Sequence, residues 1–390
     1  MTDHVFIDEA PEAGPATTAL NTGKPVQTAV AGPWQLVWAK FSRNKVAVAS
    51  GVIIVMLFLV GLFAEFLAPT LPDMSRPQFT NAPPQELRLF ATQADGSQQF
   101  QLHVTGYTMS VDLASLRRSY VIDENQVVPV GFLVKGAPYK LWGLFALDTH
   151  LFGPLNPGDT MYLLGTDKLG RDLLSRLIHG TRISMSIGLI GVGISLLLGV
   201  ALGAVSGFYG GWVDMVVQRI IEVISSMPTI PLWLGLAAAI PLTWSPLSVY
   251  FIITLIVSLF GWTGLAREVR GRFFALRSED FVTAARLDGS SERRLIFRHI
   301  LPSLTSHILA VVTLALPTMI VAETALSFLG IGLKAPIVSW GVLLQEAQNV
   351  RTIANAPWLL IWPSGAVVLT VLAYNFLGDG LRDAADPYES

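Results

Sequence analysis

Residues 279–302 read EDFVTAARLDGSSERRLIFRHILP, a polar, arginine-rich stretch between two long apolar runs. Residues 281–287 are long enough for two helical turns, and Gly289 suits the left-handed turn that ends a helix. Apolar residues then recur at three- and four-residue spacing over 291–300, before Pro302 limits the helix. The stretch therefore predicts a short helix–turn–helix between two membrane spans.

The composition is typical of a membrane protein. Hydrophobic residues make up 52% of the chain and charged residues 14%, whereas soluble domains usually carry about a quarter charged residues. The absence of cysteine excludes disulfides, thiolate metal sites and thiol nucleophiles. The sequence also lacks a phosphate-binding GxxxxGK[ST] loop, an HExxH motif and a dinucleotide fingerprint. We expect no catalytic residue, no metal site and no ATP hydrolysis by this chain.

Six apolar runs are each long enough to cross the hydrocarbon core of a bilayer. The sequence therefore predicts an all-α polytopic membrane protein. The expected spans are residues 46–68, 183–207, 215–240, 247–263, 304–326 and 358–378.

Two different segments precede the first span. Residues 1–32 are rich in Ala, Thr, Pro and Gly and lack apolar periodicity, which predicts a disordered tail. Residues 33–45 place Trp34, Val37 and Trp38 on one helical face, close to lysine and arginine residues. That pattern predicts either an interfacial helix on the inner leaflet or simply a basic flank of the first span.

Residues 70–163 are too polar to span a membrane and predict a small β-containing insert. Runs of alternating apolar and polar residues at 87–93 and 98–104 flank a turn that contains Asp95 and Gly96, which is a strong hairpin signal. The insert is too small for a large core of its own, so we expect it to pack on a partner or on the membrane domain.

Residues 164–180 read LGTDKLGRDLLSRLIHG and predict the start of a long helix. Asp167 can cap a helix, and Asp172 lies in a first helical turn. Arg171 and Arg176 are close enough in sequence to pair with these acids. The cluster predicts either a structural cap with ion pairs or a polar surface at the end of the bundle.

Besides Glu65, which lies near the outer end of the first span, three charged residues lie within expected spans. Arg219 and Glu222 are three residues apart, so they can meet on one helix face, and Glu323 lies in the fifth span. A charge at this depth costs kilocalories unless it is paired or faces a wet interior. The residues are therefore either structural or part of a translocation path. Pro228 and Pro231 should bend the third span.

Several segments resemble the permease subunits of ABC importers, in the dipeptide/oligopeptide branch of that family. The stretch at 279–302 resembles the family's EAA loop, although Thr283 stands where the family has an acid. Further similar segments are LGTDKLGRD at 164–172, YGGWVD at 209–214, SFLGIG at 327–332, SWG at 339–341 and GDGLRDAADP at 378–387.

The resemblance implies a role for the loop at 271–302. In the family this loop docks into a separate ATPase subunit and couples ATP hydrolysis to transport. The residues that match the coupling motif, or replace part of it, are Thr283, Ala284, Ala285, Gly289, Leu301 and Pro302. For the translocation path or gate the candidates are Arg219, Glu222 and Glu323, and for an outer gate or binding-protein contact they are Asp167, Arg171, Asp172 and Trp340.

The resemblance also implies a type I importer architecture, in which residues 164–390 form the permease domain with spans two to six. This chain would be the C-type half of a permease heterodimer in the bilayer. Its partners would be two ATPase subunits, which hold ATP and Mg²⁺, and an extracytoplasmic solute-binding protein, which the β insert would contact. We expect a peptide-like solute, with oligosaccharides, opines and metal complexes as alternatives, and no nucleic acid.

The charge distribution predicts the orientation in a bacterial inner membrane. Arginines are concentrated between spans four and five, whereas the loop between spans five and six carries only Lys334 and Arg351. The positive-inside rule places both termini and residues 279–302 in the cytoplasm and the β insert outside. A stand-alone carrier or channel would predict inverted repeats, which we do not find. An intramembrane enzyme would need a base, metal cluster or nucleophile beside Glu222 and Glu323, and none is evident.

Overall fold

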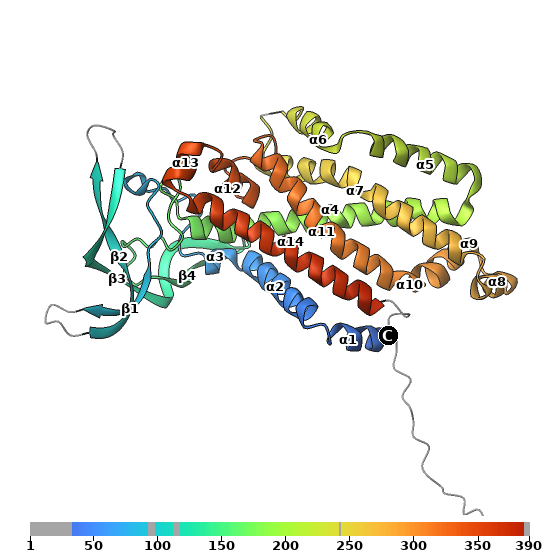
Figure 1. Cartoon of the computed structure of the whole chain (residues 1–390), viewed down its shortest axis with the longest axis horizontal. Coiled ribbons are helices and arrows are strands. Elements are labelled where there is room, and N and C mark those ends of the chain that lie inside the picture. The colour runs from blue at the N-terminus through green and yellow to red at the C-terminus, as the bar shows by residue number, and fades with distance from the viewer. Residues whose placement is uncertain (1–32, 93–97, 112–117, 242, 386–390) are drawn as a thin grey trace, which may run out of the picture.

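The computed structural model describes residues 33–92, 98–111, 118–241 and 243–385, which form a helical bundle with a β-sheet at one end (Figure 1). The expected tail at 1–32 and the hairpin turn at 94–97 lie outside the described residues. Five described helices are long and apolar enough to cross a membrane, and a broken pair can count as a sixth span. The five are α2 (Lys45–Leu62), α4 (Leu173–Tyr209), α7 (Pro246–Leu276), α11 (Thr305–Phe328) and α14 (Trp358–Ala385).

The third expected span is not one kinked helix. It consists of α5 (Gly211–Ser226) and α6 (Thr229–Ala238), whose axes differ by 83° across Met227 and Pro228. Pro228 has no backbone N–H and its ring excludes a helical carbonyl four residues earlier. A second proline at 231 falls in the first turn of α6, where proline is well tolerated. The prolines were expected to bend the helix, but the break is sharper than a bend.

Glycines let α4 and α7 approach closely. A Cβ atom on Gly203 would lie 2.6 Å from the carbonyl oxygen of Ala266, and one on Gly207 would lie 2.6 Å from that of Arg270. These two glycines are four residues apart, so they occupy one face of α4. This stripe brings the two helix backbones close together.

A short helix precedes the first span. α1 (Pro33–Phe41) packs Phe41 and Val37 against Leu381 and Ala384 near the end of α14, while Trp38 stays exposed. α2 then begins after Asn44, whose side chain accepts a hydrogen bond from the Ala47 N–H. The first span is followed by one more turn, α3 (Ala64–Leu67).

The insert between α3 and α4 contains one four-stranded antiparallel sheet in the order β1-β2-β3-β4. A short helix, η1 (Pro77–Phe79), precedes it. The paired β1 and β2 correspond to the predicted hairpin, and β3 and β4 form a second one. The strands are β1 (Leu87–Thr92), β2 (Gln98–Val111), β3 (Arg118–Leu141) and β4 (Phe145–Pro154).

The sheet and the arginine-rich stretch lie at opposite ends of the bundle (Figure 1). The sheet end also carries α12 (Trp340–Glu346) and α13 (Val350–Asn355). The other end carries α8 (Asp280–Leu287), α9 (Glu292–Arg294) and α10 (Leu301–Ser303). This arrangement separates the two groups of candidate residues by the length of the spans.

Candidate functional site

The arginine-rich stretch folds as the predicted helix–turn–helix. α8 ends at Leu287, and Gly289 follows with φ +79, the left-handed geometry that glycine adopts without strain. α9 then leads into a π-helical segment, η2 (Leu295–Ile300), and into α10.

The π-helical turn was not predicted. In it, the Leu301 N–H donates to the carbonyl of Ile296, five residues earlier. The turn directly precedes Pro302, which supplies no N–H and crowds the preceding turn. A wider turn accommodates the proline without ending the helix.

The helix–turn–helix has a buried and an exposed face. Its buried side chains pack against the ends of α4 and α7, in a cluster that includes Phe208 and Phe273. The exposed side carries Thr283, Ala284 and Gly289, and Leu287 is 84% exposed. We call these four residues the coupling face. The buried residues are Val282, Ala285, Leu295, Ile296 and Ile300, while Leu301 is half-buried and Pro302 exposed.

Polar contacts fix the helix–turn–helix to the turn between α4 and α5. The Arg277 guanidinium donates to the carbonyls of Gly207 and Phe208, at 3.4 and 3.3 Å. The Tyr209 hydroxyl donates to the Glu292 carboxylate at 2.9 Å. These links join segments 69 to 83 residues apart in the chain. From the sequence, Arg277 could be identified only as one of several arginines in a basic loop.

Arg270 and Asp214 form a second link at the same end. Their side chains make a bidentate ion pair between α7 and the first turn of α5, and the Ser206 hydroxyl also donates to the carboxylate. Bidentate pairs of this kind fix orientation as well as distance. Arg270 and Asp214 therefore fix α7 to α5 at the end of the bundle where the helix–turn–helix is attached.

A cavity of about 750 Å³ lies where α5 and α6 are broken, and α7 and α11 form its other walls. Most of its lining is apolar. The indole Nε1 of Trp233 is buried there and has no hydrogen-bond partner among the described residues. Its polar lining residues are Ser225, Thr229, Thr263 and Thr318.

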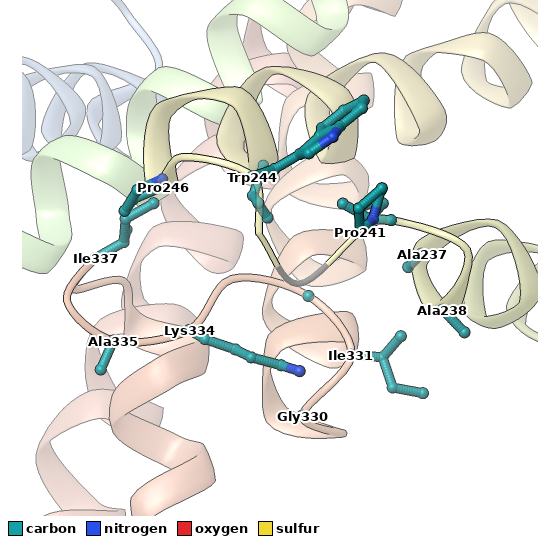
Figure 2. Close-up of a pocket in the computed structure, with 13 residues that line it drawn as sticks. Ala237, Ala238, Pro241, Trp244, Pro246, Gly330, Ile331, Lys334, Ala335 and Ile337 are labelled. Atoms are coloured by element: carbon teal, nitrogen blue, oxygen red, sulfur yellow. The ribbon is translucent and has the colours of Figure 1, made fainter.

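A smaller cavity of about 320 Å³ opens at the sheet end, between the α6–α7 and α11–α12 connections (Figure 2). Trp244 and Ile331 form part of its apolar lining, and Lys334 is the charged side chain among its lining residues. Both cavities are lined by residues in or next to α6, α7 and α11. They are the candidate solute sites in the described part of the chain.

Arg219 and Glu222 form the predicted ion pair within α5, with an N–O distance of 2.8 Å. Their side chains are 77% and 56% exposed, so they face away from this chain's own bundle. Neither residue lines the cavities described above. A role on the solute path therefore requires a wall supplied by a second subunit.

Glu323, the third candidate for a path or gate, lies inside the bundle of this chain and lines neither cavity. Its carboxylate is fully buried and accepts hydrogen bonds from Ser327 and Ser339, both at 2.8 Å, and from Ser184 at 3.5 Å. These serines lie on α11, at the start of α12 and on α4. Buried carboxylates need such donors, so Glu323 joins three helices rather than facing solute.

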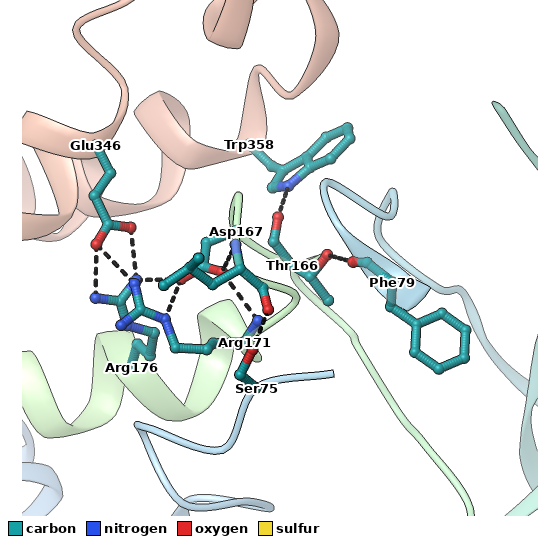
Figure 3. A network of polar contacts seen from close by, with 9 residues as sticks. Ser75, Phe79, Thr166, Asp167, Arg171, Arg176, Glu346 and Trp358 are labelled. Atoms are coloured by element: carbon teal, nitrogen blue, oxygen red, sulfur yellow. Dashed lines mark hydrogen bonds and ion pairs between the residues drawn. The ribbon is translucent and has the colours of Figure 1, made fainter. Parts of the chain in front are cut away.

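Of the candidates for an outer gate or binding-protein contact, Asp167, Asp172 and Trp340 are buried in this chain and Arg171 is half-buried. Asp167 is fully buried in an ion-pair network with Arg171 and Arg176 (Figure 3). Glu346 of α12 completes the network, at 2.9 Å from Arg171 and 2.6 Å from Arg176. Glu346 was missed, although it is the only acid in residues 327–350.

Asp172 and Trp340 are buried in the same region. Asp172 caps α4 by accepting from the Ser175 N–H and hydroxyl, at 2.8 and 2.6 Å. Burial raises its pKa to about 6, because the charged form loses water. Trp340 packs with Met185 and Tyr374. These residues hold the sheet end of the bundle together and present no docking surface of their own.

No group of three or more His, Cys, Asp or Glu side chains that could hold a metal ion occurs within the described ranges. The candidate functional sites are the coupling face and the two cavities described above, of about 750 and 320 Å³.

Comparison with known proteins relates this chain to one group of transporters. Residues 199–388 match the family described as "Binding-protein-dependent transport system inner membrane component", and residues 32–84 match the "N-terminal TM domain of oligopeptide transport permease C". A dipeptide transport system permease protein of Alkalihalophilus pseudofirmus is 34% identical over 275 residues, 68% of this chain and 87% of that protein.

Two other similarities differ in extent. A glutathione transport system permease protein of Pectobacterium atrosepticum is 30% identical over 372 residues, 95% of each chain. A solved structure of the MetNI methionine ABC transporter, in an inward-facing conformation, aligns with 53% of this chain and 96% of its own, at a TM-score of 0.40 and 14% identity.

Proposed function

This chain belongs to the binding-protein-dependent transport system inner membrane components, as a permease subunit of the dipeptide/oligopeptide branch, and on that premise we propose how it works. It pairs with a second permease subunit and is driven by two separate ATPase subunits that hold ATP and Mg²⁺. A solute-binding protein delivers the solute on the side of the β-sheet.

The coupling face is the contact with an ATPase subunit. Leu287 stands out as a large apolar side chain that is 84% exposed at a turn, which favours burial in a partner's groove. The opposite face of the same helices is packed on α4 and α7. When the ATPase subunits close on ATP, the helix–turn–helix moves with them and tilts the spans to which Arg270 and Arg277 attach it.

The solute path runs past the break between α5 and α6. The 750 Å³ cavity is within the size range of small-molecule sites. Its threonine and serine hydroxyls can hydrogen-bond the polar backbone of a peptide, and its apolar walls tolerate varied side chains. We infer a peptide-like solute, as in the relatives named for dipeptide and oligopeptide transport. Arg219 and Glu222 face the path once the second permease subunit closes it.

The basic end of the bundle is cytoplasmic and the sheet end is outside. Seven arginines lie at positions 270, 272, 277, 286, 293, 294 and 298, in or beside the helix–turn–helix. Both termini then lie in the cytoplasm. The single observation that carries the proposal is the coupling face: an exposed, partly apolar surface on an element fixed to three spans.

Gly289→Asp tests this assignment. The variant places a charged side chain on the coupling face, where an added Cβ would meet nothing within this chain, and it also strains the turn because φ is +79 at this position. We expect normal membrane insertion but loss of ATPase co-purification in mild detergent and loss of solute uptake by vesicles. Gly158→Asp adds the same charge in open space within the insert and should leave ATPase association unchanged. ATPase association and uptake that both survive in Gly289→Asp would show that the coupling face is misassigned.

A further inference from the structure

The hairpin that joins β3 and β4 ends in an apolar tip, residues 141–145, which read LWGLF. Trp142 and Gly143 form the two-residue turn with φ of 53 and 75. Such turns favour Asn, Asp and Gly, so tryptophan at this position is costly. Leu144 is 76% exposed, and Phe145 is exposed beside it. The exposure of Leu144 and Phe145 indicates an apolar environment outside the chain.

The tip is attached to the end of the first span. The Trp142 indole N–H donates to the Leu62 carbonyl, the last of α2, at 2.7 Å, and its ring lies 5.9 Å from that of Phe63. α2 has 18 residues, which rise about 27 Å, close to the roughly 30 Å of a hydrocarbon core. Leu62 therefore lies at the boundary between hydrocarbon and headgroups, the depth at which tryptophan is enriched.

The tip also reaches inward along α2. Trp142 and Gly143 line a groove of about 540 Å³ together with Phe58, Leu62 and Leu189. Phe58 lies one helical turn before Leu62, about 6 Å deeper in the bilayer. The tip therefore lies at the same level in the bilayer as the last helical turn of α2.

The surface next to the tip faces lipid. Val55, Met56 and Leu59 of α2 are exposed, and α2 has the smallest buried share of the five candidate spans. α5 and α6, with the exposed Arg219–Glu222 pair, lie along the opposite edge of the bundle (Figure 1). The second permease subunit is proposed on that far edge, so the tip continues the lipid-facing surface of α2.

We propose that residues 141–145 insert into the outer leaflet and anchor the β-sheet to the bilayer beside α2. The occupant of this surface is phospholipid: headgroups around the Trp142 indole and the first acyl carbons around Leu144 and Phe145. This differs from the expectation that the insert serves to contact the binding protein. It requires that α2 crosses the membrane, but not that the coupling face is correctly assigned.

The cysteine-free chain allows single labels. Leu144→Cys and, as a matched control, Phe100→Cys, whose side chain is 70% exposed on β2, would each carry an environment-sensitive fluorophore. The full transporter complex would be placed in nanodiscs. Quenching would be measured with phospholipid bearing a nitroxide at acyl carbon 5, and separately with iodide in water.

We expect the Leu144 label to be quenched by the nitroxide lipid at least threefold more than the Phe100 label, and the order to reverse with iodide. Phe145→Cys should repeat the result at an independent position. Equal iodide quenching at positions 144 and 100 would overturn the proposal. Protection of position 144 from both quenchers, or protection only after the binding protein is added, would assign the tip to a protein partner and would also overturn it.

Discussion

The ion-pair network at the sheet end and the coupling face at the other end both lie in motif-like segments, yet they differ in where their contacts are made. Asp167, Arg171, Arg176 and Glu346 are paired with one another inside the chain. Leu287, on the coupling face, is left in solvent. The difference teaches that a motif residue already paired within its own subunit stabilises the fold, whereas an exposed one is available to a partner.

The comparison also predicts how the two regions respond to substitution. Removing one member of a buried ion pair leaves an uncompensated charge in a low-dielectric interior. Removing an exposed apolar side chain leaves the folded chain almost unchanged. The stability of the isolated chain should therefore separate the two regions, from the largest effect to the smallest.

Asp167→Ala should produce the largest loss. It leaves Arg171 and Arg176 with only Glu346, and we expect about 3–5 kcal/mol of destabilisation. Thermal unfolding of the purified chain in detergent would measure this. Lys168→Ala changes the exposed neighbour and should stay within about 0.5 kcal/mol. A stable Asp167→Ala protein that has lost only binding-protein association would restore the docking interpretation.

Glu323→Ala should follow, at about 1–3 kcal/mol, because it leaves the hydroxyls of Ser327 and Ser339 without their buried acceptor. Glu323→Gln keeps one carbonyl acceptor and should lose less. Transport per folded molecule should be retained in Glu323→Gln. If that variant folds normally but no longer transports solute, Glu323 belongs to the path and not to the helix contacts.

Asp172→Asn should have a smaller effect that depends on pH. The folded pKa of Asp172, about 6, lies above the ordinary value of an aspartate carboxyl. The folded state therefore binds the proton more tightly, and wild-type stability falls as pH rises from about 4 to 6. Asn keeps a cap acceptor without the buried charge. We expect the variant to gain stability relative to wild type as pH rises from 4 to 8, measured by unfolding temperature. A difference that does not vary with pH would show that the carboxyl is not buried as a charge.

Leu287→Ser should have the smallest effect on stability, within about 0.5 kcal/mol, while ATPase co-purification falls sharply. Val282→Ser changes a fully buried side chain of the same helix and should lower stability by about 1–3 kcal/mol. Equal destabilisation by the two substitutions would remove the distinction between the faces of α8.

Local features of the fold were predictable from sequence. The turn at Gly289, the paired strands β1 and β2 and the apolar spans depend on residues close together in the chain. Long-range contacts were not predictable: nothing near Glu346 indicates an ion pair with residues 170 to 175 positions away. Burial of Glu323 and Trp340 likewise depends on how α12 folds back onto α4 and α11. The sequence could assign these residues to a segment, but it could not show whether their side chains are buried or exposed in the folded chain.

The close contact of Gly203 and Gly207 with α7 has a mechanical consequence. At these two positions the α4 backbone lies directly against backbone atoms of α7 and the side chains of Val269 and Phe273, so we expect α4 and α7 to move as one unit. α4 has 37 residues and is about 56 Å long. A rotation of about 10° at its Tyr209 end would move the far end by about 10 Å, by the same helical rise. On the proposed function, a small movement of an ATPase subunit at one end of α4 would therefore produce a larger displacement of its other end, at the opposite surface of the membrane.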